Sequence, residues 1–409
     1  MELITTSNLS HSGPRLPVEL VRETLECIED SEHDDLTAPY IISPVLIACS
    51  LVCHAWNDIC RPRVFSTIVI NQDTARLIDR LSFLHFTAPH LSRYIVCLHL
   101  WWDDDVTLVP RWVSDCIVRT KNLSSLYLVW SPVTTVAAHA ALSTLGIMSL
   151  LPVLRLEELA LIGWHVDENG SDILPFLSAS SNSLNELVIV ITHAFGQETE
   201  STAPATIRLG ALRELAVIGK GDRFPRINAI ECPNLRSLTI EHLGDGPWGV
   251  PPGISGELAD LTVTASCSSL IPELGHSMRP SDLKLDMQRG SHESYHNVMV
   301  WVRDCIACLP FPYVVRELVI GITNEESTDL DALEYPSLYD YEELYCAVRS
   351  LPQHGALRKM VVALKTFITS GKIYEDNYER EDAKLKEAFG PLLRTGKMTV
   401  SLTLDQVQD

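Results

Sequence analysis

The sequence is poor in positive charge for its length, with 32 lysine and arginine residues against 53 aspartate and glutamate residues and a net charge of −21. Surfaces that bind nucleic acids or anionic membranes need clustered cations, so we expect neither among its partners. The acidity permits a basic partner without requiring one, because a solvated acidic surface explains it as well.

Long hydrophobic runs are also missing. The longest, about residues 40–53, contains Pro44 and falls short of the roughly 18 apolar residues that a membrane span needs. The opening MELITTSNLSHSG has no basic region followed by an apolar stretch, so no secretory signal is expected. The 11 cysteines are odd in number and lie mostly in apolar runs, which is typical of free thiols in a reducing compartment. We therefore expect an intracellular protein, cytoplasmic, nuclear or both.

Two common catalytic patterns are absent from the sequence. It contains neither G-x-S-x-G nor a phosphate-binding loop. Cys305 and Cys308 form a single C-x-x-C pair, whereas a zinc site needs a second pair at suitable spacing. We predict that the protein is not an enzyme, and we expect no catalytic residues, no metal site and no cofactor.

The sequence does contain a repeated phrase, L-x-x-L-x-Φ, in which Φ is Leu, Ile or Val. Aligned on its middle apolar residue, successive copies lie 22 to 42 residues apart. Six clear copies occur at 122–130, 155–164, 183–192, 211–220, 234–243 and 257–266, and weaker ones at 94–102, 281–287, 314–323 and 356–365. One unit of this size cannot bury its apolar side alone, so the copies are expected to stack into a continuous core.

Each copy is predicted to be one β-strand, because the L-x-Φ alternation puts both apolar side chains on the same face. Residues 66–72 and 398–404 are predicted to be the two end strands. The longer returns between strands have helical apolar spacing, which predicts helices at 75–84, 110–120, 298–309, 341–351 and 381–393. The shorter returns, such as 244–256, are expected to be loops or single turns, and the fold class is α/β.

Over residues 66–409 this pattern resembles the leucine-rich repeat superfamily. The resemblance implies a β-strand/helix solenoid with irregular repeats. The asparagine that usually follows the strand in this family is missing, so a regular horseshoe curvature is not implied.

Residues 15–65 carry a different signal, preceded by a polar arm, 1–14, that is expected to be flexible. Leu16 and Pro17 open a short amphipathic helix whose apolar residues, Val18, Val21, Leu25 and Ile28, share one face. A second apolar run, 45–52, leads to Trp56. This stretch resembles the F-box, and together with the following Arg61, Pro62, Val64 and Phe65 it is similar to F-box-like proteins of mushroom-forming fungi.

The F-box resemblance implies an all-helical module that docks on the Skp-family adaptor of a cullin-type ubiquitin ligase. The residues implied in adaptor binding are Leu16, Pro17, Leu20, Leu51, Val52 and Trp56. The protein would then be the substrate-recognition subunit, with its repeats binding an unknown target protein. The alternative is a non-catalytic repeat scaffold with a vestigial F-box-like cap, in which Leu51, Val52 and Trp56 are simply core. About 16 residues separate Ile28 from Val45, longer than is usual in the family, which favours this alternative.

Aromatic residues occur at or just past several predicted strand ends. We expect them to lie on adjacent strands at one edge, where they are candidates for binding the target: Trp101, Trp102, Trp130, Trp164 and His165. Packing beneath the connecting loops is the alternative. The acidic run 103–105 that follows is either a solvated loop or a contact for a basic segment.

Overall fold

The computed structural model describes somewhat more than half of the chain. The described residues are 19–20, 23, 44–70, 79, 81–102, 116–117, 119–130, 155–165, 177–178, 180–193, 206–219, 230–242, 248, 250, 254, 257–266, 269–272, 278–289, 294–309, 314–324, 335–350, 357–366 and 374–406.

The first half of the chain combines short helices with strands. Helices α2 (Pro44–Ser50) and α3 (His54–Val64) are followed by β1 (Thr67–Ile70), a π-helical turn η1 (Phe83–Thr87) and a 3₁₀ turn η2 (Pro89–Tyr94). Strands then follow: β2 (Cys97–Trp102), β3 (Ser125–Trp130), β4 (Glu158–His165), β5 (Glu186–His193), β6 (Ile207–Arg208), β7 (Glu214–Gly219) and β8 (Ile230–Glu231).

The second half alternates strands with longer helices. It contains β9 (Ser237–His242), β10 (Asp260–Ser266), β11 (Asp282–Arg289), α9 (Tyr295–Cys308), β12 (Glu317–Asn324), α10 (Leu338–Ser350), β13 (Lys359–Thr366), α11 (Tyr374–Ala388), α12 (Gly390–Leu393) and β14 (Thr399–Gln406).

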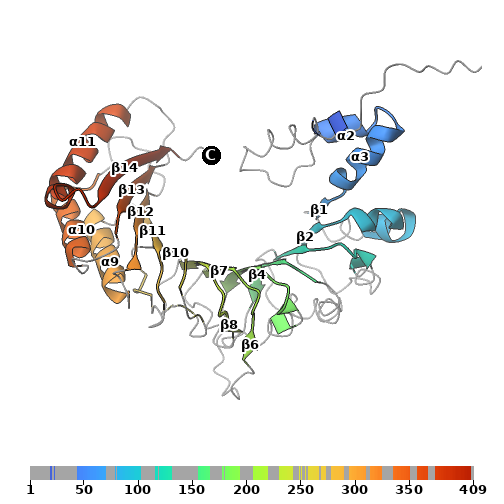
Figure 1. Ribbon diagram of the computed structural model, residues 1–409, viewed down its shortest axis with the longest axis horizontal. Coiled ribbons are helices and arrows are strands. Elements are labelled where there is room, and N and C mark those ends of the chain that lie inside the picture. Colours follow the sequence, from blue (N-terminus) through green and yellow to red (C-terminus); the bar gives the residue numbers. More distant parts are fainter. Residues whose placement is uncertain are drawn as a thin grey trace, which may run out of the picture.

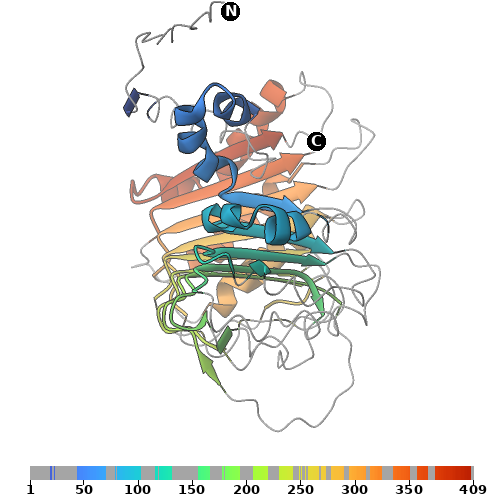
Figure 2. The same ribbon diagram turned by 90° about the vertical axis from the view of Figure 1, so that its right-hand side faces the viewer.

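Twelve of the strands form one parallel sheet in the order β1-β2-β3-β4-β5-β7-β9-β10-β11-β12-β13-β14. The sheet bends into an arc whose inner side is formed by the strands, while α9, α10 and α11 lie on the outer side (Figure 1). Seen from the side, the strands run next to one another in a single direction (Figure 2). The chain is therefore a mixed α/β protein with one large, curved parallel sheet.

None of the described helices is both long enough and apolar enough to cross a membrane.

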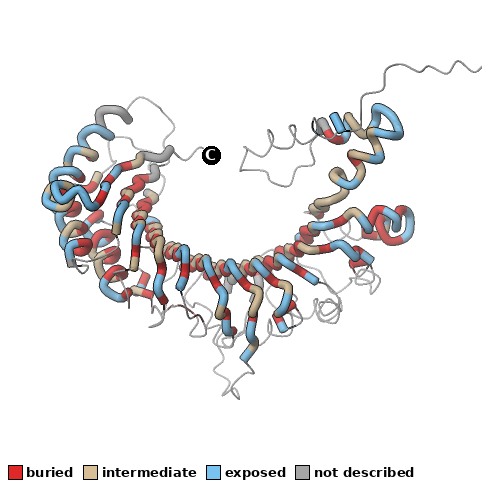
Figure 3. Tube along the Cα trace, viewed as in Figure 1, coloured by how far each residue is buried: buried red, intermediate tan, exposed pale blue. Residues whose placement is uncertain are grey.

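The strand register agrees with the sequence alignment. The middle apolar residue of each copy pairs with that of the next strand, for example Leu187 with Leu215 and Leu215 with Leu238. Both end strands are present as β1 and β14. Residues alternate between buried and partly exposed along β9, β10 and β11, so one face of the sheet forms the core (Figure 3). The prediction of one strand per copy is confirmed.

Three ladders of apolar side chains make this core. The first Leu of the phrase, the middle Leu and Φ are all buried, as in Leu184, Leu187 and Ile189. Burying a side chain of this size stabilises the fold by about 1.5–3 kcal/mol, so each copy of the phrase contributes through three positions that only stacking can cover.

The helices agree with the sequence only in part. Helices α9 and α10 match the predictions at 298–309 and 341–351. The segment predicted at 381–393 is two helices, because Pro391 lacks the N–H that a continuous helix would need at that position. Half of 75–84 and most of 110–120 lie outside the described residues. The two-residue strands β6 and β8 were not predicted.

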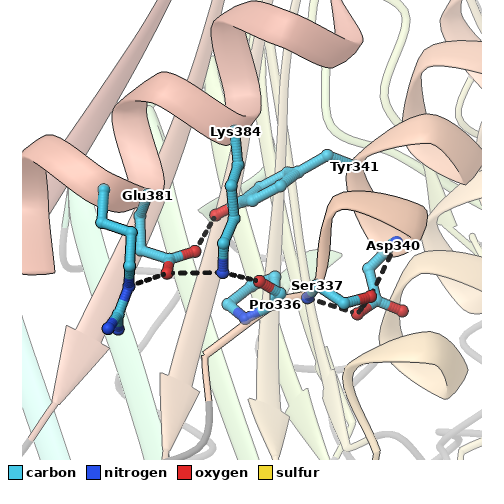
Figure 4. Close-up of polar contacts among 7 residues, drawn as sticks. Pro336, Ser337, Asp340, Tyr341, Glu381 and Lys384 are labelled. Carbon is cyan, nitrogen blue, oxygen red and sulfur yellow. Dashed lines mark hydrogen bonds and ion pairs between the residues drawn. The ribbon is translucent and has the colours of Figure 1, made fainter.

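A buried carboxylate joins α10 to α11 on the outer side of the sheet (Figure 4). Glu381 is fully buried and accepts a hydrogen bond from the Tyr341 hydroxyl at 3.5 Å and from Lys384 Nζ at 2.8 Å. Lys384 also donates to the Pro336 carbonyl at 3.0 Å. The network fixes the angle between the two helices because every oxygen of the buried carboxylate has a partner.

Candidate functional site

The turn between α2 and α3 presents apolar side chains to solvent. Leu51 is 81% exposed and Val52 is 64% exposed, although both belong to an apolar run. Their backbone N–H groups donate to the Ala48 and Cys49 carbonyls at 3.1 and 3.2 Å, which makes the turn tight. Ile47 on α2 and Leu20 are also exposed. These residues leave a substantial apolar surface uncovered on a small helical unit.

Trp56 behaves differently from its neighbours in the turn. It is only partly exposed and packs against a small core formed by Leu46 and Cys60, together with Ile59 and Val64. This core is separate from the core of the sheet. The helices therefore hold Trp56 against their own interior while Leu51 and Val52 face outward. Leu16 and Pro17 lie outside the described residues.

The aromatic residues at the strand ends lie on neighbouring strands. Trp102 on β2 and Trp130 on β3 are register partners. Trp164 follows an irregularity in β4 at Gly163, whose φ of 74° is one that side-chain-bearing residues rarely adopt, and His165 pairs with His193. Of the five candidate residues, the structure describes only the side chain of Trp101, which is 47% exposed.

A series of side-chain contacts that was not predicted from the sequence lies on the same face of the sheet as Trp101. Cys97 Sγ is 3.2 Å from His99 Nε2, the His99 ring stacks on Tyr127 at 4.0 Å between centroids, and the Tyr127 hydroxyl donates to Glu158 at 3.2 Å. Burial raises the pKa of Cys97 to about 12, and burial lowers the pKa of His99 to about 4. A nucleophilic cysteine needs the opposite, a thiolate beside a protonated imidazole, so this geometry favours packing rather than attack on a substrate.

The residue immediately before the middle Leu is acidic on six of seven consecutive strands, from β4 to β12. We call this set the carboxylate row: Glu158, Glu186, Glu214, Asp260, Asp282 and Glu317, with Ser237 on β9 as the interruption. The signal was present in the repeated phrase, where Glu-Leu or Asp-Leu recurs, but it becomes a row only through the strand register.

No family model matches the chain, and no curated protein is significantly similar to it. Its function is therefore inferred from its residues and their geometry.

Proposed function

We propose that this chain is the substrate-recognition subunit of a cullin-type ubiquitin ligase. Its N-terminal helices form an F-box-like module that docks on a Skp-family adaptor. The observation that carries the proposal is the exposure of Leu51 and Val52 at the tip of the α2–α3 turn. Burying each of them in a partner's groove is worth about 1.5–3 kcal/mol, and apolar anchors on helices are a recurrent means of recognition.

The curved sheet is the part that binds the target in this proposal. Its strands and returns form a leucine-rich-repeat-like solenoid of irregular repeats, and rigid stacked repeats of this kind hold a partner in a defined orientation. The protein itself performs no chemistry. It raises the local concentration of a target lysine near the ubiquitin carrier that the rest of the ligase brings.

One observation favours a second function, that of a non-catalytic repeat scaffold. Helix α3 ends at Val64 and β1 begins at Thr67, and Phe65 and Ile68 pack against the core of the sheet. A helical cap that protects the first edge of a sheet would be joined in this way. In that case Leu51 and Val52 would be exposed without a partner, and the protein would not enter a ligase.

Co-elution with a fungal Skp-family adaptor in size-exclusion chromatography separates the two functions. A ligase subunit forms a stable complex with one adaptor molecule, whereas a scaffold with a vestigial cap elutes separately. Circular dichroism of the chain recovered from the column establishes that a separate peak is folded protein, so that a negative result counts against docking.

A further inference from the structure

The inner face of the sheet is a large surface with an unbalanced charge. Side chains alternate between the two faces of a strand, and the core takes the middle Leu and Φ. The residues before and after the middle Leu therefore belong to the inner face, which no helix of the described residues covers (Figure 1). The carboxylate row crosses this face at the beginning of six of the seven strands from β4 to β12.

Register pairing brings the carboxylates of the row close together. Glu158 pairs with Glu186 and Glu186 with Glu214, so these acidic residues stand on strands about 4.8 Å apart. Like charges directly opposite each other in a sheet destabilise it, yet three occur in succession here, and Asp260 and Asp282 repeat the arrangement. Such an arrangement costs stability in the isolated chain and is relieved when a cation lies over it.

The described cations do not pair with the first part of the row. Within the described residues, no ion pair involves Glu158, Glu186, Glu214 or Asp260. The nearest arginine in sequence, Arg213, donates instead to the Asn234 carbonyl at 3.3 Å. Among the described residues, an ion pair with a member of the row occurs only at its far end, where Lys359 contacts Glu317 at 3.1 Å.

The row ends beside Tyr127. Glu158 accepts a hydrogen bond from the Tyr127 hydroxyl at 3.2 Å. The half-exposed Trp101 on β2 lies four residues further along the strand than Cys97, which is in line with Glu158 through Ser125. By strand alternation Tyr127, Glu158 and Trp101 all belong to the inner face. An exposed aromatic ring on the same face as a row of carboxylates suits a segment with several lysine and arginine side chains, in which one cation stacks on the ring and others lie over the acids. The described His, Cys, Asp and Glu side chains include no group that could hold a metal ion, so a distributed organic cation fits better.

We propose that the inner face over β2 to β10 binds a lysine- and arginine-rich segment of a polypeptide, laid across the strands along the carboxylate row. Charge complementarity selects this occupant, since the face offers a line of acceptors and no described cation among them. This inference rests on the proposed function, because it names the kind of target that the sheet recognises: a protein with an exposed basic segment.

The test measures binding of a fluorescently labelled oligo-lysine peptide to the full chain by anisotropy at low salt, without any adaptor. The row variant is Glu186→Gln/Glu214→Gln/Asp260→Asn. The control variant, Glu342→Gln/Glu379→Gln/Glu387→Gln, removes the same charge from exposed positions on α10 and α11. We expect the control to bind like the wild type and the row variant to bind at least about tenfold more weakly. Binding should also weaken as salt is added.

Equal weakening in both triple variants would mean that only net charge attracts the peptide, and it would overturn the proposal, as would absence of binding by the wild type. Thermal unfolding of the row variant checks that this variant is folded. We expect its melting temperature to equal or exceed that of the wild type. The single variant Glu186→Gln provides a milder form of the same test. Because Leu51 and Val52 play no part in this assay, loss of adaptor docking and loss of peptide binding are observed separately.

Discussion

Glu186 on β5 and Glu214 on β7 are register partners in a parallel sheet, so two carboxylates of the same charge face each other across one strand spacing. Burial, then Glu158, then Glu214 raise the pKa of Glu186 above its usual value of 4.5. The carboxyl group of Glu186 is therefore harder to ionise in the folded protein than in the unfolded chain.

Replacing Glu186 with Gln should raise the free energy of unfolding at neutral pH by about 0.2–1 kcal/mol, because it removes a like-charge contact on both sides. The raised pKa of Glu186 also determines how this gain in the free energy of unfolding depends on pH. Protonation of Glu186 favours the folded state, so the advantage of the variant is present at neutral pH and disappears as the pH falls below about 4.5. Urea unfolding of both proteins at neutral and acidic pH measures this. A variant less stable than the wild type at neutral pH would contradict the repulsion, and Glu379→Gln serves as the exposed control.

His99 should make the protein sensitive to mild acid. Its pKa is lowered by burial, with Glu158 acting in the opposite direction, from 6.5 to about 4. Its contribution to stability is complete above pH 6.5 and is lost as the pH falls toward 4. We expect His99→Phe, which keeps a ring against Tyr127, to lose less stability over this range than the wild type. The exposed His90→Gln should behave like the wild type, and a His99→Phe protein with unchanged pH dependence would refute the assignment.

Much of the fold could be predicted from sequence because its signal is repetitive. Ten of the twelve strands in the large sheet repeat one apolar phrase, and aligning Leu126, Leu159 and Leu187 already supplied the register. The carboxylate row was contained in the same alignment but was missed, since each acidic residue is unremarkable alone and gains its meaning from the neighbouring strand. The break before Gly390 was also readable from Pro391.

The candidate site was less predictable because it depends on which way side chains face. An apolar run predicts burial, yet Leu51 and Val52 stand in a tight turn and point outward while Trp56 packs inward. The spacing of apolar residues in the sequence does not show which of these side chains is exposed, because that depends on the angle between α2 and α3. Similarly, the contact of Cys97 with His99 follows from strand alternation, whereas their opposed pKa directions depend on burial.

Gly321 on β12 should not tolerate a side chain. A Cβ atom built there would overlap Asp286 Oδ1, and Asp286 is held by Lys284 at 2.7 Å. We expect Gly321→Ala to destabilise the protein by about 1–3 kcal/mol through overpacking. In an Asp286→Ala background the penalty should largely vanish, because the obstructing carboxylate is gone. Equal penalties in the two backgrounds, measured by chemical denaturation, would show that Asp286 is not the obstacle.

Glu381 should be important for the packing of α10 on α11. Glu381→Ala removes the acceptor of Tyr341 and Lys384, and we expect a loss of about 1–3 kcal/mol. The loss stays moderate because the Lys384 and Arg380 side chains are partly exposed and can turn to water. The neighbouring exposed residue provides the control, since Glu379→Ala should change stability by less than about 0.5 kcal/mol. A Glu381→Ala protein as stable as this control would show that the network contributes nothing.

The most direct measurement is the affinity of the chain for a Skp-family adaptor with and without the two exposed residues of the α2–α3 turn. The variant is Leu51→Asp/Val52→Asp, and the control is Leu270→Asp, which places one aspartate on another exposed leucine. Both changes lie on side chains that face solvent, so neither should unfold the protein. We expect calorimetry to find 1:1 binding by the wild type and by the control, and none by the double variant. Full binding by the double variant would contradict docking through this turn.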